Sequence, residues 1–259
     1  MKRAPSSLLR FIGLLVVCTL ALQLAFAVRI AMMRFVDPQS TSFQRSEIWR
    51  LLVEKHSIDW SQQWVAGAQI SPHLKRAVIA SEDAGFAEHS GVEWDALEKA
   101  WERNQKAEAR VAKINERVER QAAKPNAAPL TKPLVEPKVV GGSTITQQLA
   151  KNLFLAGERS LPRKAQEFII AFMLEAMLNK SRILEIYLNS VEWGEGLFGA
   201  EAAAHHYFHV PAAQLSSIAA ARLAVMLPAP KRFEKRPDSA YVVSRAGTVA
   251  ARMGAVEVP

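Results

Sequence analysis

Cysteine is almost absent from this sequence: Cys18 is the only one among 259 residues, so no disulfide can form within the chain. The glycine-rich fingerprints of nucleotide binding, G-x-x-x-x-G-K-[ST] and G-x-G-x-x-G, are absent, and so is the H-E-x-x-H pattern of zinc hydrolases. Runs that alternate apolar and polar residues, as a half-buried β-strand does, are almost absent as well. The single cysteine excludes a disulfide framework, and the missing glycine-rich fingerprints give no support to nucleotide-dependent chemistry. The lack of alternating runs favours a mainly α-helical fold.

The charge of the chain is basic. The 33 Lys and Arg exceed the 25 Asp and Glu, which gives a formal net charge of +8 at pH 7. Hydrophobic residues make up 49% of the chain, which is enough for the core of a sizeable domain and too many for a disordered protein. A basic balance favours an anionic partner, which can be nucleic acid, a lipid surface or an anionic substrate. The positions of the basic and apolar residues must decide between these.

Residues 11–28 form an uncharged apolar run that is interrupted only by Thr19 and Gln23. At a rise of about 1.5 Å per residue, such a helix nearly covers a bilayer core of about 30 Å. The basic residues that precede the run favour a cytoplasmic N-terminus and an exported body. We therefore expect a single transmembrane anchor. A cleaved signal peptide is the alternative, because residues 25–27 (Ala-Phe-Ala) resemble a cleavage site.

The patterning divides the chain into a cytoplasmic tip and anchor (1–34), a membrane-proximal connector (35–70) and a main domain (71–259). Within the domain, residues 105–138 stand apart: a charged helix is expected over 106–121, and prolines then recur at every fourth position. A packed helix or strand does not accommodate prolines at that density, so we expect a solvated insertion with an extended tether. Other helices are expected over 73–81, 92–101, 145–153, 160–179, 181–189, 199–208, 215–226 and 238–252.

Glu82 and Asp83 end an apolar helical run and are the first candidates for chemistry. Acidic groups at the C-terminus of a helix lie at the negative end of its dipole. Among apolar neighbours such carboxylates tend to have a raised pKa, which suits general acid–base catalysis. The alternative is a surface pair without function, because most carboxylates lie at the surface.

A second candidate is the segment 141–152, which is rich in glycine, hydroxyl and amide groups and opens a helix. Backbone N–H groups and side-chain donors converge at such a helix start and can bind phosphate or sugar oxygens. Lys151 lies two turns beyond Thr144 on the same helix face. The alternative is an ordinary capped helix, since Thr144 and Gln147 have capping-box spacing.

Several cations surround one carboxylate in a third segment. Arg159, Arg163 and Lys164 precede Glu167, and the last two lie one helical turn from it. A solvated salt-bridge face is the alternative, but the apolar residues that follow favour the border of a cleft. Histidines also cluster at 205, 206 and 209, yet without the zinc-hydrolase pattern they do not predict a metal site.

Six pieces of the chain, in this order, resemble the glycosyltransferase family 51 domain, which polymerises peptidoglycan glycan strands. They are Glu82-Asp83-x-x-Phe86-x-x-His89-x-Gly91, Gly142-x-Thr144-x-Thr146-Gln147-Gln148-x-x-Lys151-Asn152, Arg163-Lys164-x-x-Glu167, Arg182-Ile183-Leu184-x-x-Tyr187-Leu188-Asn189, Glu192-Trp193-Gly194-x-Gly196-x-x-Gly199-x-Glu201-Ala202-Ala203 and Arg222-Leu223-Ala224-x-x-Leu227-Pro228-x-Pro230. The resemblance covers about residues 70–235 apart from the insertion. The chain has no Ser-x-x-Lys motif of a penicillin-binding transpeptidase, so the monofunctional biosynthetic transglycosylases are the more similar group.

The resemblance implies a mainly α-helical, lysozyme-like fold and lipid II as the substrate. It implies Glu82 as the general base and Glu167 as a second catalytic residue near the donor pyrophosphate. Substrate contacts are implied for Asp83, Phe86, His89, Ser143, Thr144, Gln147, Gln148, Lys151, Asn152, Arg159, Arg163 and Lys164. No tightly bound cofactor is implied. A divalent cation such as Mg²⁺, held by the pyrophosphate with Glu167, is compatible with it.

The implied partners are lipid II, the growing glycan chain, the bacterial membrane and other cell-wall synthesis or division proteins, and no nucleic acid. The implied location is the bacterial inner membrane, with the catalytic domain on the periplasmic side. The sequence departs from some relatives at Gln166, where they carry a further lysine, and in the insertion 105–138. The insertion's eight Lys and Arg against four acidic residues suit anionic lipid headgroups. Two alternatives remain: a lysozyme-like lytic enzyme, and a catalytically silent scaffold that binds lipid II.

Overall fold

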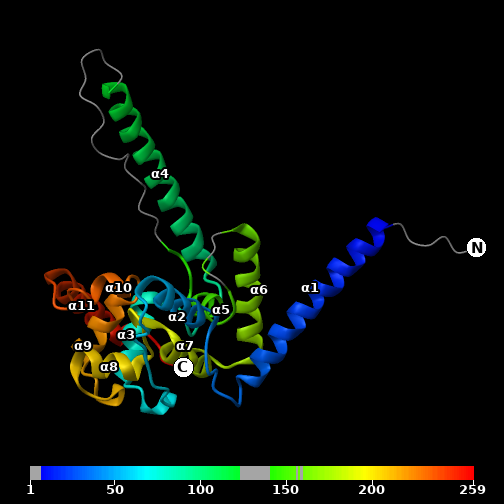
Figure 1. Cartoon of the computed structure of the whole chain (residues 1–259). Helices are drawn as coiled ribbons and strands as arrows, with labels where there is room; N and C mark the ends of the chain where they lie inside the picture. The colour runs from blue at the N-terminus through cyan, green and yellow to red at the C-terminus, as the bar shows by residue number, and fades with distance from the viewer. Residues whose placement is uncertain (1–6, 123–140, 156, 158–159) are drawn as a thin grey trace, which may run out of the picture. The chain divides into compact units, whose positions relative to one another are not determined.

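The computed structural model describes residues 7–122, 141–155, 157 and 160–259 (Figure 1). The proline-rich tether predicted within 105–138 and the candidate residue Arg159 lie outside the described residues. The chain forms two compact units, one made of Met1–Val92 with Thr144–Pro259 and the other of Glu93–Ser143. Each unit is described by itself.

The first unit is mainly helical. Its helices are α1 (Ser7–Met32), α2 (Ser42–Lys55), α3 (Pro72–Glu82), α5 (Ile145–Phe154), α6 (Leu161–Met177), α7 (Lys180–Ser190), α8 (Ala200–Phe208), α9 (Ser217–Met226), α10 (Pro230–Phe233) and α11 (Ala240–Arg252). Short 3₁₀ turns cover Gly67–Gln69, Ala212–Gln214 and Met253–Ala255. The helices predicted between 73 and 252 in this unit are confirmed to within about two residues at most ends, because cap residues mark where they start.

Helix α2 lies inside the segment that the sequence analysis treated as a connector. Its start is fixed by a capping box, in which the Thr41 hydroxyl accepts the Gln44 N–H and the Gln44 side chain accepts the Thr41 N–H. The helix lacks a clear apolar stripe, so its periodicity gave no signal. It ends at His56, which adopts a left-handed conformation with φ 54°.

A three-stranded sheet of order β1-β3-β2 lies beside the helices. Strand β1 (Ser61–Gln62) pairs in parallel with β3 (Leu197–Phe198), and β2 (Glu192–Gly194) pairs with β3 in antiparallel fashion. Strands of two or three residues are too short to show alternation, which explains why the sequence did not predict them.

The core of the first unit is built by α3, α9 and α11 on one side and by α5, α6 and α7 on the other. Trp193, Tyr187 and Phe86 are its largest fully buried side chains. This packing brings the C-terminal end of α3 to the N-terminal half of α5, where the first two candidate segments meet.

Helix α1 is long and apolar enough to cross a membrane by length and composition, and most of its side chains are exposed in the structure. Its C-terminal part packs on the first unit beside α6 (Figure 1). Phe26 meets Phe154 edge to face at 5.2 Å, and Ile30 is fully buried. Gln23, inside the apolar run, exchanges two amide hydrogen bonds of 2.7 and 2.9 Å with Gln166 of α6. The helix is therefore suited to a single-pass anchor.

The second unit contains helix α4 (Trp94–Ala122), which has 29 residues. Its surface carries ion pairs one turn apart, Glu102 with Lys106 and Glu116 with Arg120. The predicted solvated helix over 106–121 is confirmed, and it is continuous with the helix predicted over 92–101.

Candidate active site

Glu82 is the last residue of α3, and its carboxylate is held by a single amide. Gln148, on α5, donates from Nε2 to Glu82 Oε2 at 3.0 Å. Burial raises the pKa of Glu82, the Gln148 hydrogen bond acts in the opposite direction, and the neighbouring Asp83 raises it further. The net direction is upward, as predicted from its place at the end of an apolar helix. A carboxylate with a raised pKa is a stronger base once it is ionised.

The amide of Gln148 is itself oriented by Tyr187. This tyrosine on α7 is fully buried, and its hydroxyl donates to Gln148 Oε1 at 2.8 Å. Burial and the charges of Glu82 and Asp83 raise the pKa of Tyr187 well above its ordinary value, so the hydroxyl stays a donor. The oxygen of the amide thus faces Tyr187 and its NH₂ group faces Glu82. The sequence analysis did not assign Tyr187 a role, although it belongs to the motif Arg182-Ile183-Leu184-x-x-Tyr187.

Asp83 joins the end of α3 to the start of α5. Its Oδ2 accepts the Ile145 N–H at 2.9 Å, and its Oδ1 lies 2.8 Å from His89 Nε2. The other ring nitrogen of His89 accepts the Gly91 N–H at 3.1 Å, so the hydrogen is on Nε2 and is donated to Asp83. Asp83 is buried. Together these bonds place Glu82 and Gln148 side by side.

Four of the predicted substrate contacts are buried in the structure. Phe86 is fully buried and lies under the ammonium group of Lys180 at 4.5 Å, so it offers no surface to a ligand. Thr144 and Gln147 are buried and form the capping box of α5, and the Thr144 hydroxyl also donates to the Gly91 carbonyl at 2.6 Å. Burial and internal hydrogen bonds favour supporting roles for Asp83, Phe86, Thr144 and Gln147, and their predicted contacts with the substrate stay predictions.

Four other predicted residues line one cavity of about 380 Å³: Gln148, Lys151 and Asn152 from α5, and Arg163 from α6. That volume lies within the range of about 300–1,000 Å³ that is usual for ligand pockets. Ser143 is half-buried and belongs to the second unit, so its predicted contact stays a prediction.

Glu167 lies one helical turn after Arg163 on α6. The carboxylate is only 3% exposed, and it accepts from Arg163 Nη1 at 3.0 Å and from Lys164 Nζ at 2.5 Å. This confirms the predicted i,i+4 and i,i+3 neighbours. Each of the two predicted catalytic carboxylates is therefore bonded to a residue that lines the same cavity, Glu82 to Gln148 and Glu167 to Arg163.

The donor set gives little support to a metal site held by the protein itself. No three His, Cys, Asp or Glu side chains gather into such a site within the described part of the chain. Both oxygens of Glu167 already accept from cations. Of the three clustered histidines, His205 pairs with Glu201 at 3.0 Å, and His209 ends α8 in a left-handed conformation. A divalent cation would have to be held mainly by the substrate, so that prediction stays untested.

A carboxylate with a raised pKa beside a cavity lined by cations is typical of an enzyme that acts on an anionic substrate, and the apolar N-terminal helix is consistent with a membrane anchor. The transglycosylase family matches residues 52–113 and 127–254, which is more than half of the chain. The chain belongs to this family. The predicted family, the lysozyme-like helical fold and the class of peptidoglycan glycosyltransferase are thereby confirmed.

Similar proteins are known from several bacteria. A biosynthetic peptidoglycan transglycosylase of Paraburkholderia phytofirmans is 46% identical over 259 residues, which cover 100% of this chain and 96% of that protein. One of the same name from Burkholderia pseudomallei is 50% identical over 240 residues, which cover 93% of this chain and 83% of that protein. A third, from Paraburkholderia xenovorans, is 45% identical over 259 residues, with coverage of 100% and 96%.

Proposed function

We propose that this transglycosylase polymerises lipid II into linear β-1,4-linked glycan strands and releases undecaprenyl pyrophosphate. The observation that carries the proposal is the shared cavity. Gln148, which holds the carboxylate of Glu82, lines it together with the cations Lys151 and Arg163. A base held beside a cavity that carries anion-binding groups is what glycosyl transfer from a pyrophosphate donor requires.

Glu82 is the general base of the proposed reaction. It takes the proton from the 4-hydroxyl of the acceptor GlcNAc, and the oxygen attacks the anomeric carbon of the donor while the bond to the pyrophosphate breaks. Attack from the face opposite the leaving group inverts that carbon. The raised pKa of Glu82 favours proton uptake at neutral pH, and the Tyr187–Gln148 pair keeps the carboxylate in one orientation.

Arg163, Lys151 and Lys164 stabilise the charge that develops on the departing pyrophosphate. Glu167 fixes two of these cations by direct bonds, so their positions are set before the substrate binds. Arg163 also carries a buried Nε with no hydrogen-bond partner among the described residues, a donor that a phosphate oxygen could satisfy. A bound divalent cation would supply further charge neutralisation at the pyrophosphate.

The location that fits this substrate is the bacterial inner membrane with the catalytic domain on the periplasmic side. Helix α1 is suited to a single-pass anchor, and the basic residues before it favour a cytoplasmic N-terminus. The Gln23–Gln166 bonds join the anchor to α6, the helix that carries Arg163 and Glu167. Two of the proposed anion-binding residues, Arg163 and Lys164, therefore lie on a helix that packs against the anchor, which suits a lipid-linked donor.

The proposal can be tested by incubating the purified full-length chain in detergent with labelled lipid II in one reaction and with intact sacculi in another. We expect glycan polymer from lipid II and no soluble muropeptides from sacculi. Muropeptide release without polymer would replace the proposal by the lytic alternative. Lipid II binding without either product would leave the scaffold alternative.

A further inference from the structure

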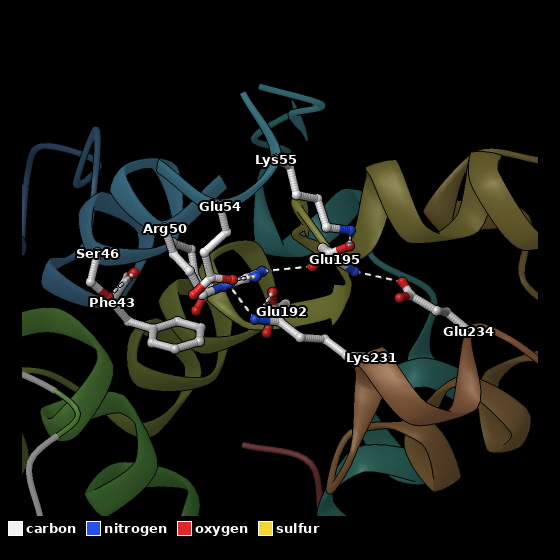
Figure 2. Close-up of polar contacts among 10 residues, drawn as sticks. Phe43, Ser46, Arg50, Glu54, Lys55, Glu192, Glu195, Lys231 and Glu234 are labelled. Carbon is white, nitrogen blue, oxygen red and sulfur yellow. Dashed lines mark hydrogen bonds and ion pairs between the residues drawn. The ribbon is translucent and has the colours of Figure 1, made fainter. Parts of the chain in front are cut away.

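Beside the same cavity lies a group of charged residues that the mechanism above does not use, and one of them, Glu192, lines the cavity. Glu192 is the first residue of β2. It is only 6% exposed. Figure 2 shows it between side chains from α2 and α10. The sequence analysis placed Glu192 in a family motif but gave it no function.

The hydrogen bonds within this charged group do not include one carboxylate oxygen, Oε1 of Glu192. Arg50 donates to three carboxylates, at 2.9 Å to Glu47, 2.9 Å to Glu54 and 2.7 Å to Glu195 (Figure 2). Lys231 donates to Glu47, and its Nζ also forms a long ion pair of 3.5 Å with Glu192 Oε1 that lacks the geometry of a hydrogen bond.

Within the described part of the chain, the Oε1 atom of Glu192 is buried and accepts no hydrogen bond. The ion pair with Lys231 offsets part of the cost of burying this charged oxygen, but a buried acceptor without a hydrogen-bond donor still calls for an explanation. Since Glu192 lines the cavity, a bound molecule is the natural source of the missing donor.

The charges around the cavity restrict what this donor can be. An anion would be repelled by the carboxylate of Glu192 itself. A metal ion or an ammonium group would face Lys231 at 3.5 Å from the same oxygen and the cations Lys151 and Arg163 on the cavity wall. A neutral hydroxyl or amide N–H avoids both penalties.

The cavity wall around Glu192 is otherwise apolar. Phe43, Val191, Leu227 and Pro230 line the cavity around Glu192. A wall of this kind with one hydrogen-bond acceptor matches a pyranose ring, whose C–H face is apolar and whose edge carries hydroxyl and acetamide donors. The sugar of a pyrophosphate-linked donor must also lie directly next to the cations that bind the phosphate.

We propose that Glu192 is a saccharide-binding residue of the transferase, whose Oε1 accepts a hydrogen bond from a hydroxyl or acetamide N–H of the lipid II disaccharide. The proposal rests on the proposed function, since it names a further contact to the same substrate. It makes Glu192 a determinant of substrate affinity, whereas Glu82 determines the rate of the chemical step.

Protonation gives this contact a pH dependence. Burial raises the pKa of Glu192 to about 7; Lys231 and Arg50 lower it, and Glu47 raises it. The other charged residues on the cavity wall are Lys151 and Arg163. The ionised carboxylate is the stronger acceptor, so binding favours the ionised form. Affinity is therefore full above pH 7 and is lost as the pH falls through that value.

The test is the steady-state kinetics of lipid II polymerisation by the full-length chain from pH 6 to pH 8. We expect Glu192→Gln to raise KM about tenfold at pH 8, equivalent to about 1.4 kcal/mol, with kcat changed less than twofold. The KM of the unchanged chain should rise severalfold between pH 8 and pH 6, and that of Glu192→Gln should stay constant. Glu192→Leu, which has no acceptor, should raise KM at every pH.

Glu54→Gln is the matched control, because Glu54 belongs to the same charged group, is exposed and does not line the cavity. Its KM should match that of the unchanged chain. If Glu192→Gln folds, polymerises lipid II and keeps both the KM and its pH dependence, the saccharide contact is wrong while the proposed function stands. If the unchanged chain makes no polymer, both fail together.

Discussion

The substitution Tyr187→Phe tests whether the chain of bonds from Tyr187 through Gln148 to Glu82 holds the base in position. It removes one hydroxyl from a fully buried ring that does not line the cavity, so no substrate contact is lost directly. The change deletes the 2.8 Å hydrogen bond to Gln148 Oε1. The orientation of the amide is then less firmly fixed, and its 3.0 Å bond to Glu82 weakens.

The expected magnitudes follow from those two bonds. Loss of a part-buried hydrogen bond costs about 0.5–1.5 kcal/mol, so the free energy of unfolding should fall by roughly that amount. Misplacement of a base by a fraction of an ångström lowers kcat, and we expect a loss of about tenfold with KM nearly unchanged.

The pH profile gives the sharper readout. The Gln148 hydrogen bond lowers the pKa of Glu82, so weakening that bond raises the pKa further. A general base is active only when ionised, so activity falls as the pH drops below its pKa. The acid limb of kcat/KM should therefore move to higher pH in Tyr187→Phe.

The assay is polymerisation of labelled lipid II between pH 5 and pH 9, together with thermal unfolding. Tyr207→Phe serves as the control, because the Tyr207 hydroxyl donates to the Trp193 carbonyl at 2.9 Å and has no bond to Glu82 or Gln148. If Tyr187→Phe loses stability but keeps kcat and a superimposable pH profile, Tyr187 is a packing residue and the positioning argument is wrong.

Two further changes test the fold and the anchor. Gly196→Ala should lower the melting temperature by roughly 6–12 °C, since φ is +71° and the new Cβ would lie 2.0 Å from the Asp59 carbonyl oxygen. Gly254→Ala is the control, because its new Cβ would lie in open space and should change the melting temperature little. Equal melting temperatures of the two variants would contradict the strain expected at Gly196. In a double-mutant cycle of Gln23→Leu and Gln166→Leu in micelles, we expect a coupling of about 0.6–2 kcal/mol. Additive losses would show that the amide pair does not stabilise the docked anchor.

The helices could be predicted because their signals are local. Thr144 acts as the N-cap that its capping-box spacing with Gln147 indicated, and the apolar periodicity of α5 and α11 is strong. Helix α2 was missed because its apolar stripe is weak, although Thr41 and Gln44 form a capping box. The strands could not be predicted because two or three residues carry no periodicity.

The site could be predicted only in outline. The motifs identified the segments, but they did not distinguish residues that face the cavity from those that support it. Burial makes that distinction: Phe86 and Gln147 are inside, whereas Gln148 and Lys151 line the cavity.

Contacts between residues far apart in the sequence were not accessible either. Tyr187 and Gln148 are 39 positions apart, and Arg50 and Glu195 are 145 apart. Their meeting depends on how α2, α5 and α7 pack in the first unit.

The most direct test of the account is the rate of glycan formation from lipid II by Glu82→Gln, compared with Glu88→Gln on the exposed turn that follows α3. The account predicts that Glu82→Gln binds lipid II and unfolds at a temperature close to that of the unchanged chain, but makes polymer at least a hundredfold more slowly. Glu88→Gln should polymerise normally. Polymer formation by Glu82→Gln at the unchanged rate would contradict the assignment of Glu82 as the base.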